Sequence, residues 1–223
     1  MIIKAIIPAG GSSNRYKGGN KLLEILEGKP VILHSIETMN SIKEIEEIII
    51  PSATDLIPEL ETILGTKYPK VKIVQGGRNR QESVYNGLKA CKECSYVIIH
   101  DGARPLIKKE TIMGCLQAAK DKKAVIVAVK AIDTIKRVDE NLKIIETPNR
   151  DFLWNVQTPQ IFDYKLILDA HKKLEGQNFS DDAGLLENLG IDVYVFEGEY
   201  SNFKITTPDD LTRASIEIQK CNI

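Results

Sequence analysis

Apolar runs rich in β-branched residues alternate with amphipathic stretches along the chain, and this alternation constrains the possible folds most strongly. The apolar runs lie at residues 2–7, 45–50, 71–75, 96–100, 124–129, 193–196 and 203–206. The stretches with helical periodicity lie at 30–40, 56–65, 80–92, 109–122, 164–175, 181–189 and 208–220. Strands that alternate with helices build a mostly parallel sheet covered by helices on both faces. The sequence therefore predicts an α/β fold with a doubly wound sheet.

The chain has 223 residues, a length that suits one domain with a substantial core. It contains no internal repeat, low-complexity tract or linker. We therefore predict a single domain over residues 1–223.

One segment, 130–160, interrupts the alternation. Two short runs with polar alternation, 133–138 and 142–147, flank a turn at 139–141, which is the pattern of a β-hairpin. This hairpin arm, about 132–147, is too polar for the core, so it either projects into solvent or pairs with another subunit. A lone two-stranded hairpin is marginal in water, which favours a homodimer contact.

Charge and hydropathy exclude several classes of partner. Lysine plus arginine (30) nearly balances aspartate plus glutamate (31), so no overall field favours nucleic acid or an anionic membrane. No apolar run approaches the roughly 20 residues that span a bilayer, and the amino terminus lacks a secretory signal. We therefore expect a cytoplasmic protein without nucleic-acid or membrane partners.

The cysteines allow two interpretations. Cys91 and Cys94 have CxxC spacing, but a structural zinc site normally needs a second pair of ligands, which the sequence does not offer. A metal or redox role remains the alternative. We expect free, buried or half-buried thiols in a reducing compartment.

The first apolar run leads into a glycine-rich loop that reads Pro8-Ala9-Gly10-Gly11-Ser12-Ser13-Asn14-Arg15. Lys21 lies a few residues further on. Glycines let the backbone approach a ligand closely, and peptide N–H groups with two cations suit a polyphosphate. The spacing matches neither a Walker loop nor a dinucleotide-binding loop. The alternative is a glycine turn after an edge strand, with Arg15 and Lys21 solvated.

A second glycine turn, Gly76-Gly77, lies between a predicted strand and a predicted helix. Its main-chain groups and the Ser83 hydroxyl can contact the edge of a base. Taken alone, this segment is equally typical of an ordinary strand–helix connection.

Asp101 stands at the carboxyl end of the run 96–100, where open α/β sheets bind their ligands. A hard carboxylate there suits Mg²⁺ that also contacts phosphate oxygens; the alternative is an aspartate that caps a turn. We expect the neighbouring His100 to be a packed core residue.

Two further cations follow the hairpin. Arg150 can bind a phosphate with two hydrogen bonds, and its alternative is a structured loop in which Trp154 provides packing. Lys204 lies in the late apolar run 203–206, where it can also be an ordinary exposed strand lysine.

Taken together, these motifs resemble the 2-C-methyl-D-erythritol 4-phosphate cytidylyltransferase family of the non-mevalonate isoprenoid pathway. The resemblance covers essentially the whole chain. The matching segments include Ile7-Pro8-Ala9-Gly10-Gly11, Arg15, Lys21, Gly76-Gly77, Arg80, Ser83-Val84, His100-Asp101-Gly102-Ala103-Arg104-Pro105, Asp133-Thr134-Ile135-Lys136, Arg150, Leu153-Trp154, Gln157-Thr158-Pro159-Gln160 and Asn202-Phe203-Lys204-Ile205-Thr206.

The resemblance implies a nucleotidyltransferase fold, a dimer joined through the hairpin arm, and a reaction. CTP and methylerythritol phosphate would give the CDP-alcohol and pyrophosphate, with Mg²⁺. Arg15 and Lys21 would stabilise charge on the α-phosphate. Arg150, from the partner subunit, and Lys204 would position the substrate phosphate.

The resemblance also implies the remaining site residues. Asp101 would serve the metal and the nucleotide. The nucleotide would be surrounded by Pro8, Ala9, Gly10, Gly11, Gly76, Gly77 and Ser83. Arg104, Thr134 and Ser180 would line the substrate pocket. A substrate phosphate is already a nucleophile, so positioning and charge stabilisation would do most of the catalysis.

Three other functions compete with this one. Ribitol-5-phosphate cytidylyltransferase is a sister activity that uses the same donor. A non-catalytic nucleotide sensor with the same fold would be expected to lose its cationic ligands, yet Arg15, Lys21, Arg150 and Lys204 are all present. A nicotinamide oxidoreductase is excluded by the glycine spacing.

Overall fold

A computed structural model describes residues 1–10 and 20–221. Over these residues the main sheet has seven strands. They are β1 (Ile3–Ile6), β4 (Ile45–Ser52), β5 (Val71–Gln75), β6 (Tyr96–Ile99), β7 (Ala124–Lys130), β10 (Trp154–Asp163) and β11 (Tyr194–Glu197). Their spatial order is β11-β7-β10-β6-β1-β4-β5.

The sheet is mostly parallel. β1 pairs in parallel with both β4 and β6, β4 pairs with β5, and β7 pairs with β11. β10 lies antiparallel between β6 and β7. The predicted fold class, an α/β fold with a doubly wound and mostly parallel sheet, is confirmed.

Helices cover both faces of this sheet. They are α1 (Val31–Asn40), α2 (Ile57–Leu64), α3 (Arg80–Ala90), α4 (Lys109–Lys122), α5 (Tyr164–Lys173) and α6 (Ala183–Asn188). A further helix, α7 (Pro208–Cys221), lies to the side of the sheet. A short 3₁₀ turn, η1 (Thr54–Leu56), precedes α2. Among the described residues, none of the helices combines the length and the apolar character that crossing a bilayer requires.

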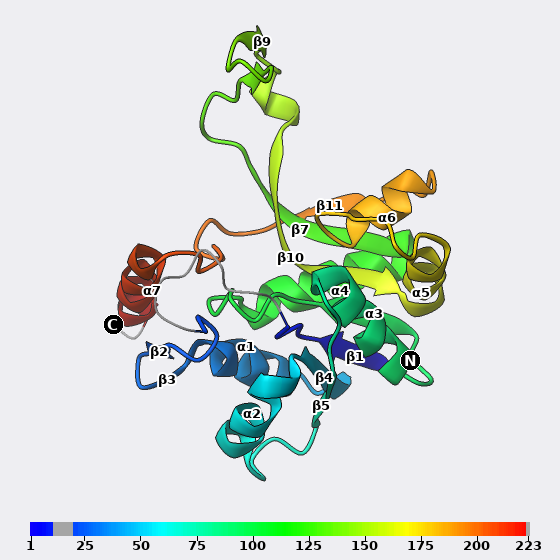
Figure 1. Cartoon of the computed structure of the whole chain (residues 1–223), viewed down its shortest axis with the longest axis vertical. Helices are drawn as coiled ribbons and strands as arrows, with labels where there is room; N and C mark the ends of the chain where they lie inside the picture. The colour runs from blue at the N-terminus through cyan, green and yellow to red at the C-terminus, as the bar shows by residue number, and fades with distance from the viewer. Residues whose placement is uncertain (11–19, 222–223) are drawn as a thin grey trace.

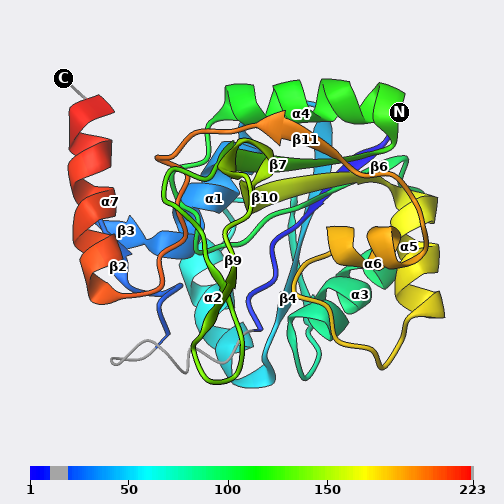
Figure 2. The same cartoon turned by 90° about the horizontal axis from the view of Figure 1, so that it is seen from above.

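The strands divide their side chains between two apolar layers because successive residues point to opposite faces. Ala5 and Ile48 pack with α1, α2 and α4 on one face. Ile6 and Ile49 pack with α3, α5 and α6 on the other. Figure 2 shows α4 on one side of the sheet and α5 and α6 on the opposite side. A smaller cluster joins α7 to the short ribbon of β2 (Ile25–Leu26) and β3 (Lys29–Pro30).

One sequence-based expectation was wrong, and one strand was missed. Residues 203–206, predicted as a strand, form no strand; a single backbone hydrogen bond, from Ile205 N–H to Ala103 O at 2.8 Å, ties the segment to the turn after β6. β10 was not predicted at all. It is nevertheless central, because it lies between β6 and β7 in the sheet.

The segment between β7 and β10 extends away from the sheet (Figure 1). Within it, β8 (Arg137–Val138) pairs antiparallel with β9 (Ile144–Glu146), and a 3₁₀ turn, η2 (Arg150–Phe152), leads back to β10. We call residues 131–153 the arm; they include the predicted hairpin arm, about 132–147, and η2. It carries exposed apolar side chains, namely Ile132, Ile135, Val138, Leu142, Ile144, Ile145 and Phe152.

Candidate active site

Gly10, the described part of the first predicted glycine turn, lies close to the second turn, Gly76-Gly77, at the carboxyl ends of β1, β4 and β5. Ala9 pairs with Ser52, the last residue of β4, and the N–H of Gly76 donates to Ser52 O at 2.7 Å. The Ser83 hydroxyl, at the start of α3, accepts the N–H of Gly77 at 3.0 Å. The structure thus brings the predicted base-contacting residues into one neighbourhood.

Close approach explains why these positions carry glycine. A Cβ added to Gly10 would lie 2.8 Å from Ser83 Oγ, and one added to Gly77 would lie 2.2 Å from the Cβ of Glu82. Both distances are shorter than a normal van der Waals contact. Gly10 and Gly77 can therefore pack tightly against the start of α3 only because neither carries a side chain.

The glycine-rich loop itself is described in part. Gly11 and Arg15, which the sequence analysis assigned to nucleotide and phosphate contacts, lie outside the described residues. Pro8 and Ala9 end the first strand region, and Ala9 is buried. Lys21 lies half-buried in the turn that precedes β2.

Asp101 lies between two cations. Arg80 Nε donates to Asp101 Oδ1 at 3.2 Å, and Lys204 Nζ donates to Oδ2 at 2.7 Å. Burial by itself would raise the pKa of Asp101, but Arg80 and Lys204 outweigh it and hold that pKa well below its ordinary value. The carboxylate is therefore charged at neutral pH.

A hydrogen-bonded turn fixes the backbone of Asp101. The Asp101 N–H donates to Thr158 Oγ1 at 3.0 Å, and this hydroxyl lies 3.0 Å from His100 Nδ1. His100 Nε2 lies 3.2 Å from Arg104 O. Burial lowers the pKa of His100 to about 4, so the ring is neutral at pH 7. The hydroxyl accepts from Asp101 and donates to Nδ1, which leaves Nε2 to donate to Arg104 O. The expectation of a buried His100 is confirmed.

Arg104 connects this turn with the segment that carries Lys204. Its Nη1 donates to Asn202 O at 2.8 Å, and its Nη2 donates to Val156 O at 3.4 Å. The Asn202 side chain in turn donates to Thr158 O at 2.9 Å. These bonds place Asp101, Arg104 and Lys204 in one cluster although they come from distant parts of the sequence.

Three predicted substrate residues lie elsewhere in the chain. Thr134 and Arg150 are exposed on the arm, where Arg150 Nη1 donates to Ile132 O at 2.8 Å. Ser180 is exposed just before α6. Of the predicted substrate residues, the structure brings Arg104 and Lys204 together with Asp101, and it shows no contact of Thr134 or Arg150 with that cluster among the described residues.

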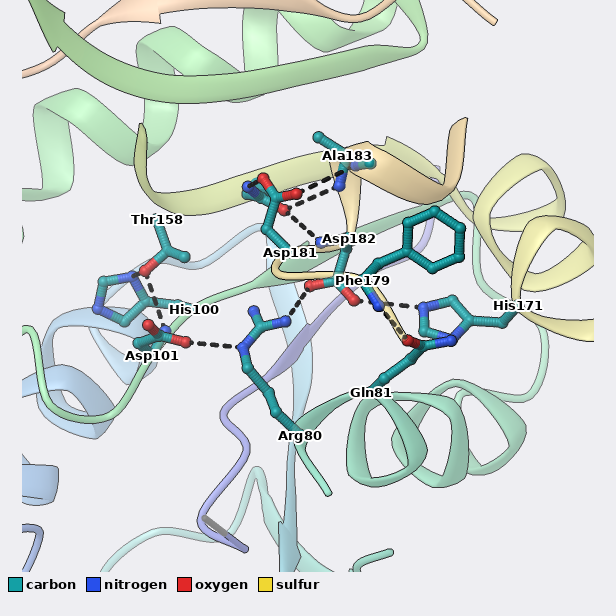
Figure 3. A network of polar contacts seen from close by, with 12 residues as sticks. Arg80, Gln81, His100, Asp101, Thr158, His171, Phe179, Asp181, Asp182 and Ala183 are labelled. Atoms are coloured by element: carbon teal, nitrogen blue, oxygen red, sulfur yellow. Dashed lines mark hydrogen bonds and ion pairs between the residues drawn. The ribbon is translucent and has the colours of Figure 1, made fainter. Parts of the chain in front are cut away.

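Arg80 and Asp182 were not among the predicted site residues. Arg80 Nη1 lies 2.8 Å from Asp182 Oδ2, so Arg80 joins the carboxylates of Asp182 and Asp101 (Figure 3). Burial would raise the pKa of Asp182, but Arg80 and His171 lower it below its ordinary value. The available signal was an arginine at the start of a helix after a glycine turn, and a pair of aspartates before another helix.

The donor set near Asp101 limits what kind of metal it can hold. Within the described residues, no group of three or more His, Cys, Asp or Glu side chains could hold a metal ion. Mg²⁺ at nucleotide sites is commonly held by one or two carboxylates together with phosphate oxygens and water. A single carboxylate at Asp101 fits such an ion and does not fit a closed metal site.

The cysteines of the CxxC pair are free thiols. Cys91 is buried and Cys94 half-buried. Burial raises the pKa of Cys91 above its ordinary value and that of Cys94 to about 11. Thiols with raised pKa values are poor nucleophiles and poor metal ligands at neutral pH. The expectation of free, buried or half-buried thiols is confirmed for this pair.

A family model described as 2-C-methyl-D-erythritol 4-phosphate cytidylyltransferase matches residues 3–220. A protein of that name from Caldanaerobacter subterraneus subsp. tengcongensis is 44% identical, over 99% of this chain and 100% of the relative. Another from Bacillus licheniformis is 40% identical, over 100% of this chain and 99% of the relative.

Solved structures agree with the sequence relatives. The 4-diphosphocytidyl-2C-methyl-D-erythritol synthase from Anaerococcus prevotii superimposes with a TM-score of 0.88 at 35% identity, over 98% of this chain and 96% of the other. The 2-C-methyl-D-erythritol 4-phosphate cytidylyltransferase from Francisella tularensis gives 0.83 at 29% identity, over 97% and 100%.

Proposed function

The chain belongs to the 2-C-methyl-D-erythritol 4-phosphate cytidylyltransferase family, and from this premise we propose how its residues bind the substrates and carry the reaction. It is a cytidylyltransferase of isoprenoid biosynthesis. The observation that supports the placement of the reaction is the cluster of Asp101, Arg104 and Lys204, which Arg80 joins to the start of α3, where Ser83 contacts Gly77. Residues 1–223 act as one nucleotidyltransferase domain in this proposal.

CTP is the proposed donor, and its cytosine lies against the glycine turns. Gly10, Gly76 and Gly77 have no side chains that could come between their main chain and a base. The Ser83 hydroxyl accepts the Gly77 N–H and holds that amide in place. Pro8, Ala9 and Gly11 complete this nucleotide site. Main-chain carbonyl oxygens can accept hydrogen bonds from the exocyclic amino group of cytosine, which uracil lacks.

The chemical step needs no general base. A phosphate oxygen of methylerythritol phosphate attacks the α-phosphorus of CTP and forms a new P–O bond. The bond from the α-phosphorus to the oxygen that bridges to the β-phosphate breaks, and pyrophosphate leaves with that electron pair. Arg15 and Lys21 stabilise the charge that gathers on the α-phosphate oxygens.

Lys204 and Arg104 are the proposed contacts for the methylerythritol phosphate within the cluster. The Lys204 side chain is 34% exposed, so its head can reach a ligand while Asp101 fixes its place. Arg150, Thr134 and Ser180 contribute further contacts. Arg150 and Thr134 lie on the arm, so in this proposal they serve the pocket of a partner subunit.

Mg²⁺ is the proposed cofactor, and Asp101 is the residue that would hold it. When bound, the ion would neutralise charge on the nucleotide phosphates. Both oxygens of Asp101 accept from cations in this structure. Arg80 and Lys204 keep Asp101 charged, and Asp101 in turn orients both cations. The substrate phosphate remains the nucleophile.

A homodimer joined through the arm is the proposed assembly. Leu142 and Phe152 on the arm are each 80% exposed, an unusual position for large apolar side chains. A second copy of the chain is the partner that this proposal names, because two arms related by a two-fold axis would cover each other's apolar side chains. The cytoplasm is the proposed location, which the free Cys91 and Cys94 support.

Pyrophosphate release with a panel of substrates tests the proposed function. We expect release with CTP and methylerythritol phosphate, release at least tenfold slower with UTP, and loss of activity when a chelator removes Mg²⁺. Faster release with ribitol 5-phosphate would instead assign the sister activity. Tight CTP binding without release of pyrophosphate in the presence of either alcohol phosphate would identify a nucleotide sensor.

A further inference from the structure

Arg80 joins two carboxylates that come from distant elements. Its Nε donates at 3.2 Å to Oδ1 of Asp101, which follows β6 in the chain. Its Nη1 lies 2.8 Å from Oδ2 of Asp182, which precedes α6. The Asp182 side chain is 1% exposed and that of Asp101 is 11% exposed. A planar guanidinium with donors on two edges can make both contacts at once.

Asp182 is itself held on two sides. His171 Nε2, from α5, lies 3.2 Å from Asp182 Oδ1. The Asp182 N–H donates to Gln160 Oε1, on β10, at 3.1 Å, and Gln160 Nε2 donates to Asp181 Oδ2 at 2.7 Å (Figure 3). The ring of His171 also stacks on Tyr85. The position of the Asp182 carboxylate is therefore set by the sheet and by α5.

The four charged groups alternate in sign along the network, in the order Asp182, Arg80, Asp101 and Lys204. Arg80 takes Oδ1 of Asp101, which leaves Oδ2 for Lys204. If Arg80 turned away, both oxygens of Asp101 would be open to Lys204. The Lys204 ammonium could then bind either oxygen and would no longer have one fixed position. The geometry of Lys204 thus depends on a carboxylate that does not touch it.

We propose that Asp182 is a positioning residue for the reaction. It holds Arg80 against one oxygen of Asp101, so that the other oxygen fixes Lys204 where it meets the phosphate of the alcohol substrate. The inference rests on the proposed function for the role of Lys204. It adds a residue outside the cluster of Asp101, Arg104 and Lys204. It also predicts different effects on the binding of the two substrates, because the glycine turns proposed to bind the nucleotide do not depend on Lys204.

Asp182→Asn is the principal test. The amide keeps the volume but removes the charge, and only one of its two groups can accept a hydrogen bond. We expect kcat/KM for methylerythritol phosphate to fall about 10- to 100-fold, since misplacing a positioning group costs up to about that factor. The KM for CTP should stay within about twofold. Calorimetric titration with methylerythritol phosphate should show a matching loss of affinity.

Two further variants make the result specific. Asp169→Asn is the matched control, because Asp169 lies exposed on α5, pairs with Lys172, and undergoes the same chemical change. It should behave as the wild type. Arg80→Lys retains the positive charge but loses the planar guanidinium that contacts both carboxylates at once. It should therefore show the same kinetic pattern as Asp182→Asn, and it tests the same relationship if Asp182→Asn does not fold. The double variant should be little worse than either single one, because both break the same network.

Opposite results would overturn the inference. One is a folded Asp182→Asn enzyme with every constant within twofold of the wild type. Another is an equal loss for CTP and methylerythritol phosphate, which would indicate a purely structural role. Failure of the proposed function would be recognised separately, because the wild-type enzyme itself would then release no pyrophosphate from CTP and methylerythritol phosphate.

Discussion

Lys204 Nζ lies 2.7 Å from Asp101 Oδ2, although 103 residues separate the two in the sequence. The contact joins the irregular segment before α7 to the end of β6, at the edge of the sheet where α/β proteins bind ligands. Burial of one charge is tolerated because the other neutralises it. The pair therefore places a cation at the site without leaving it free to move.

Lys204→Met should lower kcat/KM about 10²- to 10³-fold, because it removes a cation aimed at a phosphate. Asp101→Asn should cause a loss at least as large, since Lys204 then keeps its charge but loses its fixed place, and the proposed Mg²⁺ loses its carboxylate. The double variant should add little to the loss in Asp101→Asn. Initial-rate kinetics with both substrates measure these effects. Lys172→Met, an exposed lysine on α5, is the control and should leave the kinetics unchanged; a folded Lys204→Met enzyme with normal kcat/KM would contradict the assignment.

Much of the sheet could be predicted because its strands carry their own signal. The run 124–129 is apolar throughout and is buried on both faces in β7, as expected for a strand covered by helices on two sides. β10 lacks that signal. Its buried Gln157, Thr158 and Gln160 bond to groups far away in sequence, and its pairing with β7 shifts register between Val156 and Gln160. Such a strand is stabilised by partners that a local pattern does not show.

The site was predictable to the extent that its residues stand next to local motifs. Gly10, Gly77 and Asp101 follow predicted strands, and the structure brings all three to the start of α3, where the glycines meet Ser83 and Asp101 meets Arg80. Arg80 and Asp182 could not be assigned, because their importance comes from one guanidinium that reaches two distant carboxylates. Long-range ion pairs of this kind follow from tertiary structure and leave no periodic pattern in the sequence.

Gly10→Ala should raise the KM for CTP by about tenfold or more, because the new Cβ would lie 2.8 Å from Ser83 Oγ. The same substitution in a Ser83→Ala background should do less harm, since the clashing oxygen is gone. A double-mutant cycle on KM measures this coupling. Additive effects of the two substitutions would show that Gly10 does not meet Ser83 in the working enzyme.

Asp210 makes stability depend on pH at the start of α7. Its carboxylate accepts the N–H of Thr206 and of Thr207, each at 2.8 Å. Burial would raise the pKa of Asp210, but these bonds lower it below its ordinary 3.8. A carboxyl with a lower pKa when folded stabilises the protein above its ordinary pKa, and this stabilisation disappears as the pH falls through the folded value.

Asp210→Ala should therefore cost about 1 kcal/mol of unfolding free energy at pH 7, the usual size of a helix-capping effect. The difference from the wild type should shrink as the pH falls through the folded pKa of Asp210, which lies below 3.8. Urea unfolding at pH 7 and at a series of more acidic pH values measures it. Asp209→Ala, at the exposed neighbouring position, is the control; an Asp210→Ala cost that stayed constant down to pH 2 would refute the linkage.

Arg150 should act in the pocket of a partner subunit. It lies exposed on the arm beside Ile132, whereas Asp101 and Lys204 lie at the sheet. If two arms exchange between subunits, each pocket combines Arg15 and Lys204 of one chain with Arg150 of the other. We expect Arg15→Ala and Arg150→Ala enzymes to be nearly inactive alone and to regain activity when the two chains are co-expressed.

The size of the recovery follows from counting pockets. In a heterodimer of the two variants, one pocket would receive both intact arginines and the other would receive neither, so half of its pockets should work. A site built within one chain would recover none, because every pocket would lack one arginine. Co-expression with different affinity tags isolates the heterodimer, and Leu142→Asp, which places a charge on the exposed arm, should weaken the dimer and reduce the recovery. An inactive, fully formed heterodimer would return Arg150 to its own chain, and a monomer by light scattering would contradict the arm contact itself.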